Sequence, residues 1–352
     1  MPTLPRALAA TGLAGALFLT GCASAPEADN SNSESDYCAR MVTNSGGLED
    51  RSFNQSSWAG LEQAQEDLGI EAEVLVSTSA NDLQPNVDQA VESGCQFVLT
   101  VGFELADSTA AAAEANPDTH FAIVDEIVEA DNVKPIVFDT AQASFLAGYL
   151  AAGVSQTGVV ATFGGGNQPP VTLFMDGFVD GVAKYNETHG TQVRALGWDK
   201  AAQDGLFTGD FENVNLGRTT TQSLIDQGAD VILPVAGQVG EGAAAAALEA
   251  GNVSIIWVDN DGYETLDESF RPILLTSVIK NTTDAIIEIV GDDVDGDFTN
   301  EPFVGTLENE GVGLAPYHDL ESRVSPELQA ELDQLEQDII AGTLVIESPS
   351  AP

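Results

Sequence analysis

The side chains best suited to hold a small molecule lie in one glycine-rich segment, Thr43–Gln55, that leads into an amphipathic stretch. At its end, Phe53 offers a flat ring on which a planar ligand can stack, a contact that contributes about 1 to 3 kcal/mol when water is excluded. Asn54 carries both a donor and an acceptor, and Asp50 adds a carboxylate. The alternatives are that Phe53 packs on its own helix and that Asn54 caps it.

Two carboxylates and a lysine stand at comparable places further along. Asp125 and Asp259 each end an apolar run, and Lys280 follows the apolar run at 273–279. A carboxylate at a strand end can accept bonds from ribose hydroxyls or ring N–H groups, or it can cap the next helix. A buried lysine needs a partner such as Asp259 or a ligand acceptor. The turn Gly237–Gly242 lets backbone N–H groups approach a ligand, although its spacing is not that of a phosphate loop.

Signals of catalysis are weak. The three histidines, His120, His189 and His318, are scattered without metal-ligand spacing, and neither a Gly-x-Ser-x-Gly elbow nor a P-loop occurs. Asp259 and Asp261 could suggest glycoside hydrolysis, but neighbouring acids with a nearby lysine suit hydroxyl binding equally well. We therefore expect a binding protein and not an enzyme, with no catalytic residue, metal or cofactor.

Short apolar runs alternate with amphipathic segments from residue 38 onward, which is typical of parallel sheets covered by helices. Strands are expected at 38–43, 72–77, 96–101, 120–124, 134–138, 158–163, 192–197, 230–235 and 253–258. Helices are expected at 53–68, 83–93, 106–115, 141–154, 171–187, 216–227, 240–250, 282–291 and 326–341. So many strands are more than one sheet normally holds, so the pattern predicts an α/β protein with two Rossmann-like lobes.

The chain is expected to pass between the lobes three times, near residue 140 and at the further strand-like runs 273–279 and 311–314. The N-terminal lobe would comprise 37–140 and 281–312, and the C-terminal lobe 141–280 and 313–346. Three crossings make a hinge, and ligands of open α/β sheets bind at the carboxyl ends of strands. The turns that follow the strands should therefore line a cleft between the lobes.

The N-terminus has the features of an export signal. Arg6 precedes a short apolar run, 7–20, that is too short to span a membrane as a mature helix. The run ends in Leu19–Cys22, which resembles a lipobox, so 1–22 is expected to be a lipoprotein signal peptide and the lipidated Cys22 an anchor to the cell membrane. Residues 23–36 lack large apolar side chains and are expected to form a disordered tether. An ordinary signal peptide, cleaved within 23–26, is the alternative.

The two remaining cysteines, Cys38 and Cys95, each begin an apolar run that leads into a strand. If those strands are parallel neighbours, the thiols lie side by side, and outside the cytoplasm a disulfide can form between them and stabilise the fold by about 2 to 4 kcal/mol. The alternative is a pair of buried free thiols.

The composition is strongly acidic, with 56 Asp and Glu against 11 Lys and Arg and a formal charge of −45. Such a charge argues against a nucleic-acid partner and disfavours anionic ligands at long range. It is also compatible with a salty or wall-rich exterior.

The segment Gly46–Gln55 is similar to the GG-x-x-D-[KR]-S-F-N-Q signature of the basic membrane protein family, the PnrA-like purine-nucleoside receptor lipoproteins of ABC importers. The likeness continues over nearly the whole mature chain, in the order expected. The further matching segments are Phe121–Asp125, Gln142–Ala151, Phe174–Phe178 with Gly181 and Val182, Gly237–Gly242, Val258–Asp261 and Leu275–Asn281.

The resemblance implies a type I periplasmic-binding-protein-like fold and a purine nucleoside in the cleft. The base would lie between two aromatic rings, with acidic residues and a lysine holding base and ribose. The matching residues are Asp50, Phe53, Asn54, Asp125, Gly237, Asp259 and Lys280. Asn44 departs from the family, which often has Asp there. The second stacking ring has no clear match in the sequence, and its candidates are Phe178, Phe174, Trp257 and Trp198.

The resemblance also implies partners: ABC permease subunits and the membrane that the lipid anchor reaches, with the protein itself a monomer outside the cytoplasm. Two other functions remain open. One is a receptor of the same fold for a sugar or another small solute. The other is a surface lipoprotein that binds a macromolecule and has no tight small ligand.

Overall fold

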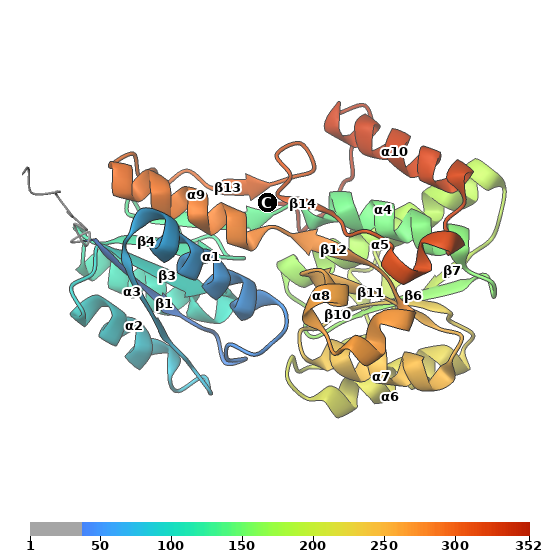
Figure 1. Ribbon diagram of the computed structural model, residues 1–352, viewed down its shortest axis with the longest axis horizontal. Coiled ribbons are helices and arrows are strands. Elements are labelled where there is room, and N and C mark those ends of the chain that lie inside the picture. Colours follow the sequence, from blue (N-terminus) through green and yellow to red (C-terminus); the bar gives the residue numbers. More distant parts are fainter. Residues whose placement is uncertain (1–36) are drawn as a thin grey trace, which may run out of the picture. The chain divides into compact units, whose positions relative to one another are not determined.

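The computed structural model describes residues 37–352, which form two α/β lobes, each built around a six-stranded sheet (Figure 1). The expected signal peptide, the lipidation site Cys22 and the tether at 23–36 lie outside the described residues. Within 37–352, no helix is long and apolar enough to cross a membrane.

The sheet of the N-terminal lobe has the strand order β13-β5-β4-β3-β1-β2, and all its pairs are parallel. Its strands are β1 (Cys38–Val42), β2 (Glu71–Leu75), β3 (Phe97–Val101), β4 (His120–Val124), β5 (Val133–Phe138) and β13 (Phe303–Gly305). Its helices are α1 (Phe53–Leu68), α2 (Leu83–Glu92), α3 (Ala106–Ala115) and α9 (Thr282–Asp295).

Successive side chains of these strands point to opposite faces of the sheet, as the pleat requires. On β4, Ala122 and Val124 belong to the core cluster that also contains Leu61 of α1. Their neighbours Phe121 and Ile123 belong to a separate apolar cluster on the opposite face, together with side chains of α2 and α3. Because both faces of the strand are apolar, helices cover the sheet on both sides, with α1 beside α9 on one face (Figure 1).

The sheet of the C-terminal lobe has the order β14-β12-β11-β10-β6-β7, with β14 antiparallel to β12 and the other pairs parallel. Its strands are β6 (Val159–Gly164), β7 (Arg194–Leu196), β10 (Val231–Val235), β11 (Ser254–Asp259), β12 (Leu274–Lys280) and β14 (Val312–Leu314). The helices are α4 (Thr140–Val154), α5 (Pro169–His189), α6 (Val214–Asp226), α7 (Val239–Ala250), the short α8 (Gly262–Thr265) and α10 (Pro326–Ile340).

The chain crosses between the two sheets three times, as the sequence predicted. It passes from β5 to α4, returns from β12 to α9, and passes again from β13 to β14. The three connections lie side by side between the lobes and form the expected hinge (Figure 1).

Helices α4 and α5 pack unusually closely because glycines face the partner backbone. A Cβ added at Gly148 would lie 2.0 Å from the carbonyl oxygen of Phe178, and one added at Gly181 would lie 2.0 Å from that of Phe145. This packing buries the Phe178 side chain completely in the core. The sequence analysis named Phe178 as a ligand-site residue, but its side chain lies in the hydrophobic core and does not line the cavity.

The disulfide between Cys38 and Cys95 is present, with Cα atoms 4.9 Å apart, and β1 and β3 are neighbouring parallel strands as that pairing requires. Most elements agree with the predicted ranges, and helices 53–68 and 106–115 agree to the residue. The sequence analysis missed β13 and a hairpin of β8 (Trp198–Asp199) and β9 (Asp204–Gly205). Strands of two or three residues are too short to show a hydrophobic period.

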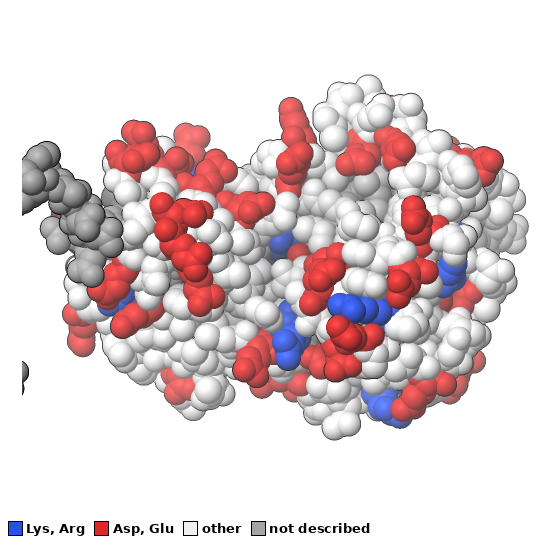
Figure 2. Space-filling model, viewed as in Figure 1, with Lys and Arg blue, Asp and Glu red and all other residues white. Residues whose placement is uncertain are grey.

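Acidic side chains are spread over both lobes on the face shown in Figure 2, and basic side chains are few there. This distribution agrees with the 56 acidic and 11 basic residues of the whole chain. The few cations that lie inside the fold therefore stand out as candidates for specific roles.

Candidate ligand-binding site

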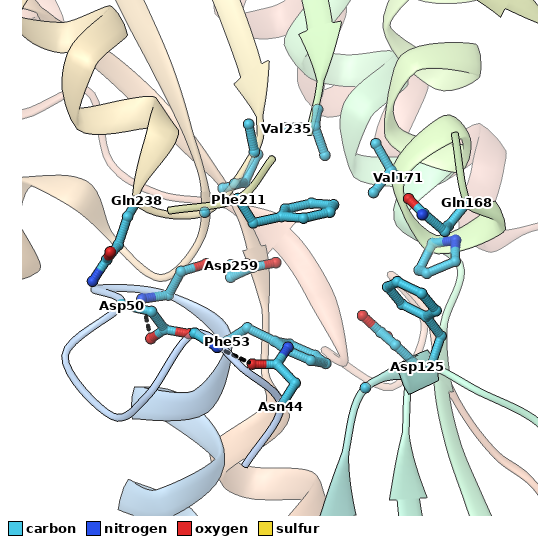
Figure 3. A pocket seen from close by; sticks show the side chains of 18 of the residues that line it. Asn44, Asp50, Phe53, Asp125, Gln168, Val171, Phe211, Val235, Gln238 and Asp259 are labelled. Carbon is cyan, nitrogen blue, oxygen red and sulfur yellow. Dashed lines mark hydrogen bonds between the residues drawn. The ribbon is translucent and has the colours of Figure 1, made fainter. Parts of the chain in front are cut away.

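A cavity of about 430 Å³ lies between the lobes, where the carboxyl ends of strands from both sheets meet. This volume is within the range of small-molecule sites. The lining residues come mainly from turns after strands and from helix starts, as expected for open α/β sheets (Figure 3). From the N-terminal lobe they are Asn44, Ser45, Gly46, Asp50, Ser52, Phe53, Gly102, Phe103, Glu104 and Asp125. From the C-terminal lobe and its crossing they are Gln168, Pro170, Val171, Phe174, Gly209–Glu212, Val235–Gln238, Val258, Asp259 and Lys280.

Asp50 holds the start of α1 and thereby places Phe53. Its carboxylate accepts backbone N–H bonds from Ser52 (3.1 Å), Asn54 (2.7 Å) and Gln55 (3.1 Å). Burial raises the pKa of Asp50 to about 6, because the loss of solvent outweighs the opposing effect of the three N–H donors. Asp50 lines the cavity, but its oxygens are already engaged by the helix start.

Asn54 is buried behind Asn44 and is not among the lining residues. Its Nδ2 donates to Asn44 Oδ1 at 2.7 Å, and that oxygen also accepts from the Gly46 N–H at 3.0 Å. Asn44 therefore has its amide nitrogen left to offer to a ligand as a donor. The sequence analysis chose Asn54 as a ligand-binding amide, but Asn44 and not Asn54 lines the cavity.

Two aromatic rings project into the cavity from opposite sides, Phe53 from the N-terminal lobe and Phe211 from the C-terminal lobe (Figure 3). Glycines let both rings approach the backbone: a Cβ at Gly102 would lie 3.2 Å from Phe53 Cε1, and one at Gly165 would lie 2.3 Å from Phe211 Cε1. Phe174 adds a third ring to the lining. The sequence analysis considered Phe174 but not Phe211, which lies in an irregular loop that has no strand or helix period.

Trp198 and Trp257, the other candidates for the second ring, are buried and do not line the cavity. Trp257 packs against Gly240 and Gly262 in the core of the C-terminal lobe. Of the aromatic candidates weighed for the far side, only Phe174 reaches the cavity.

Lys280 lies between two carboxylates at the base of the cleft. Its Nζ is 2.5 Å from Asp125 Oδ2 and 3.5 Å from Asp259 Oδ1, and its side chain is 3% exposed. Burial lowers the pKa of Lys280, but the two carboxylates outweigh burial and the net pKa lies above its usual value. Burial raises the pKa of Asp125 against the opposing effect of Lys280. Two carboxylates share one ammonium, which leaves acceptor capacity for ligand hydroxyls.

Asp125 and Asp259 both adopt left-handed backbone conformations, with φ of 60° and 67°. Such conformations are uncommon for residues other than glycine, cost on the order of 1 to 3 kcal/mol, and tend to occur at functional sites. Asp125 directly follows β4 and Asp259 is the last residue of β11, and each turns its carboxylate toward Lys280.

Direct hydrogen bonds join the two lobes along one side of the cavity. Ser52 Oγ donates to Asp259 Oδ2, and Asn260 Nδ2 donates to the Ser52 carbonyl at 3.0 Å. Gln238 Nε2 donates to the Glu49 carbonyl, also at 3.0 Å. The structure is therefore a closed arrangement, in which the loop before α1 contacts turns of the C-terminal lobe.

The cavity lining is acidic: it contains six carboxylates and Lys280 as its one cation. At the cavity rim, Ser45 donates to Glu104 through its N–H and its hydroxyl. Burial, and then the charges of Asp210 and Glu104, raise the pKa of Glu212. A ligand that carries negative charge would be repelled here, and a neutral ligand with hydroxyl or N–H donors is favoured.

Six residues expected from the sequence lie far apart in the chain but together line the cavity. They are Asp50, Phe53, Asp125, Gly237, Asp259 and Lys280. Of the ligand residues expected from the sequence, Asn54 and Phe178 lie outside it. Among residues 37–352, no group of three or more His, Cys, Asp or Glu is arranged to hold a metal ion.

The family model described as "ABC transporter substrate-binding protein PnrA-like" matches residues 39–350. The chain is 30% identical over 361 residues to the "ABC transporter nucleoside-binding protein BmpA" of Lactococcus lactis subsp. cremoris, with 97% of this chain and 98% of that protein covered. It is 27% identical over 310 residues to "Basic membrane protein A" of Borreliella burgdorferi, with 86% of each covered.

Among solved structures, an ABC transporter solute-binding protein from Aeropyrum pernix K1 is similar, with a TM-score of 0.79 and 23% identity, covering 89% of this chain and 94% of that chain. A solute-binding protein of an ABC transporter from Conexibacter woesei has a TM-score of 0.70 and 20% identity, covering 89% of this chain and 99% of that chain. At these identities the likeness shows the two-lobed fold.

Proposed function

Because the chain belongs to the PnrA-like family of ABC transporter substrate-binding proteins, we propose that its cleft binds a purine nucleoside. The observation that carries the proposal is the pairing of Phe53 and Phe211 across the cavity beside the buried cluster of Asp125, Lys280 and Asp259. Two rings on opposite sides suit a flat base, and acceptors next to an ammonium suit a ribose.

Each part of a nucleoside has a suitable partner in the lining. The base stacks between Phe53 and Phe211, and the amide nitrogen of Asn44 donates to an acceptor on its edge. The ribose hydroxyls donate to Asp125 and Asp259, and Lys280 donates to a hydroxyl oxygen. The six carboxylates of the lining select against a phosphate and therefore favour a nucleoside over a nucleotide.

In the transporter, the protein acts outside the cytoplasm and delivers its ligand to the permease subunits. We propose that it does so as a monomer tethered through lipidated Cys22, and that it has no enzymatic activity. Labelling of cells with radioactive palmitate tests the anchor, and the label should be absent from a Cys22→Ser variant.

Isothermal calorimetry tests the ligand. Guanosine, inosine and adenosine are expected to bind, and cytidine, ribose and glucose to bind more weakly or not at all. Phe53→Ala and Phe211→Ala should each weaken purine binding about 5- to 150-fold, the equivalent of about 1 to 3 kcal/mol of stacking. Phe298→Ala is the matched control, because Phe298 stacks on His120 outside the cavity.

Other outcomes separate the alternatives. A sugar that binds while nucleosides do not would retain the receptor fold and reject the nucleoside. No binding of any small solute would favour a macromolecular ligand. Equal losses in Phe53→Ala and in the Phe298→Ala control would reject the stacking site.

A further inference from the structure

Asp176 is a buried carboxylate in the middle of α5 whose role the ligand site does not explain. Its side chain has no solvent exposure, and its hydrogen-bond partners are three neutral donors. They are Trp198 Nε1 at 2.7 Å, Gln203 Nε2 at 3.1 Å and Ser348 Oγ at 2.6 Å. A buried charge is costly unless hydrogen bonds satisfy it, so these three bonds hold their segments firmly.

The first two donors belong to the β8–β9 hairpin, and the chain runs from that hairpin directly into the loop 206–213. Trp198 packs edge-on against Phe207 of this loop, with ring centroids 5.9 Å apart. Phe207 in turn lies against Gly164 at the end of β6. Phe211 stands four residues further on and lines the cavity. Asp176 thus fixes the base of the loop that carries one stacking ring.

The third donor belongs to the C-terminal segment 343–352, which runs along α5. Ser348 reaches Asp176, and one turn earlier on α5 Thr172 Oγ1 is 2.7 Å from Ser350 Oγ. Lys200, in the turn of the hairpin, donates to the carbonyl of Glu347. The segment therefore connects the hairpin to the first turns of α5.

The same turns of α5 contribute to the cavity. Pro170, Val171 and Phe174 line it, while Thr172 and Asp176 face the C-terminal segment four residues apart on one side of the helix. Two parts of the C-terminal lobe supply aromatic rings to the cavity: α5 carries Phe174, and the loop 206–213 carries Phe211. Asp176 lies on the first and is hydrogen-bonded to the hairpin that leads into the second.

We propose that Asp176 is a positioning residue for the base-binding wall, and that the C-terminal segment acts on the ligand through Ser348 and Asp176. The proposal rests on the nucleoside-binding function proposed above. It assigns a binding role to a segment that does not line the cavity.

The test compares Ser348→Ala with Ser155→Ala in the purified protein. Ser155 Oγ donates to Asp230, another buried carboxylate of the same lobe, at 2.7 Å, so both variants lose a serine–aspartate bond of similar length. Neither Ser155 nor Asp230 lines the cavity. Hydrogen exchange of the ligand-free protein and the guanosine dissociation constant are measured for both variants, at a temperature where both are folded.

Ser348→Ala should speed exchange at 206–213 and weaken guanosine binding about three- to tenfold, the effect of one lost hydrogen bond. Ser155→Ala should change neither, and Ser348→Thr should restore both because it keeps the hydroxyl. Unchanged exchange at 206–213 in Ser348→Ala would overturn the proposal. If the unmodified protein bound no nucleoside, the ligand assignment would fail, and the exchange data would still decide whether Asp176 and Ser348 position the loop.

Discussion

Replacement of Lys280 by methionine removes the one cation among the residues that line the cleft and leaves Asp125 and Asp259 facing each other. At an effective dielectric constant of about 20, opposite unit charges 2.5 Å apart attract by about 7 kcal/mol, which the cost of burying both offsets in part. Removing one partner of a buried pair typically costs about 3 to 5 kcal/mol, and we expect a loss in this range near pH 7.5.

The loss should depend on pH with a definite sign. Without the ammonium, the carboxyl pKa of Asp125 rises further in the folded variant, while in the unfolded chain it stays at about 3.9. Between these two values the folded variant binds a proton that the unfolded chain lacks. Its stability relative to the unmodified protein should therefore recover as the pH falls from 7.5 to 4.5. A second substitution, Asp125→Asn, should recover part of the loss without any change in pH.

Urea unfolding at several pH values measures this difference. Lys184→Met is the matched control, because Lys184 pairs with Glu187 at the surface and such a pair contributes about 1 kcal/mol or less. A loss for Lys280→Met that is no larger than the loss for the control, or that does not change with pH, would refute the reasoning.

Four further tests, three with substituted proteins and one with a second ligand, address separate parts of the structure. We expect Asp50→Asn to gain stability relative to the unmodified protein as the pH rises from about 3.9 to about 6. In this range the folded unmodified protein still binds a proton at Asp50 that its unfolded chain has lost, so its stability falls with rising pH, whereas the variant has no such proton. Urea midpoints across this range measure the difference. Gly102→Ala should weaken nucleoside binding in calorimetry, since its φ is 100° and a Cβ would lie 3.2 Å from both Asn44 Nδ2 and Phe53 Cε1. Cys38→Ser with Cys95→Ser should lower the free energy of unfolding by about 4 kcal/mol for a loop of 57 residues, with unchanged nucleoside affinity, because the disulfide lies away from the cavity lining. Guanosine monophosphate should bind more weakly than guanosine in calorimetry, and the gap should narrow at high salt, because six carboxylates line the cavity.

The sequence predicted those residues of the cavity lining that follow regular elements. Asp125 directly follows β4, and Asp259 and Lys280 are the last residues of β11 and β12. Each of these strands is a clear apolar run, and parallel strands bring such ends to one edge of a sheet. Phe53 begins a helix whose period is evident, so its position could also be predicted.

The other parts of the site depend on contacts that no local pattern records. Phe211 lies in a loop that is placed by Gly165, by the hairpin and by Asp176, and these contacts are tertiary. Asn44 lines the cavity while Asn54 lies buried behind it and donates to it, an arrangement that depends on the fold of the whole turn. Phe178 did carry a usable signal: Gly177 and Gly181 beside it indicate close helix packing, which buries a neighbouring ring.

In the proposed site, ligand binding and lobe closure depend on the same residues. Lys280 ends β12 where the chain crosses to α9, so it belongs to the hinge, and it pairs with Asp125 of one lobe and Asp259 of the other. Ser52 joins the same cluster from the N-terminal lobe. In the proposed binding mode, a base between Phe53 and Phe211 would also touch both lobes and would gain both stacking contacts only in the closed state. The measured affinity must then include the free energy of closure, because a ligand is bound tightly only by the fraction of molecules that are closed.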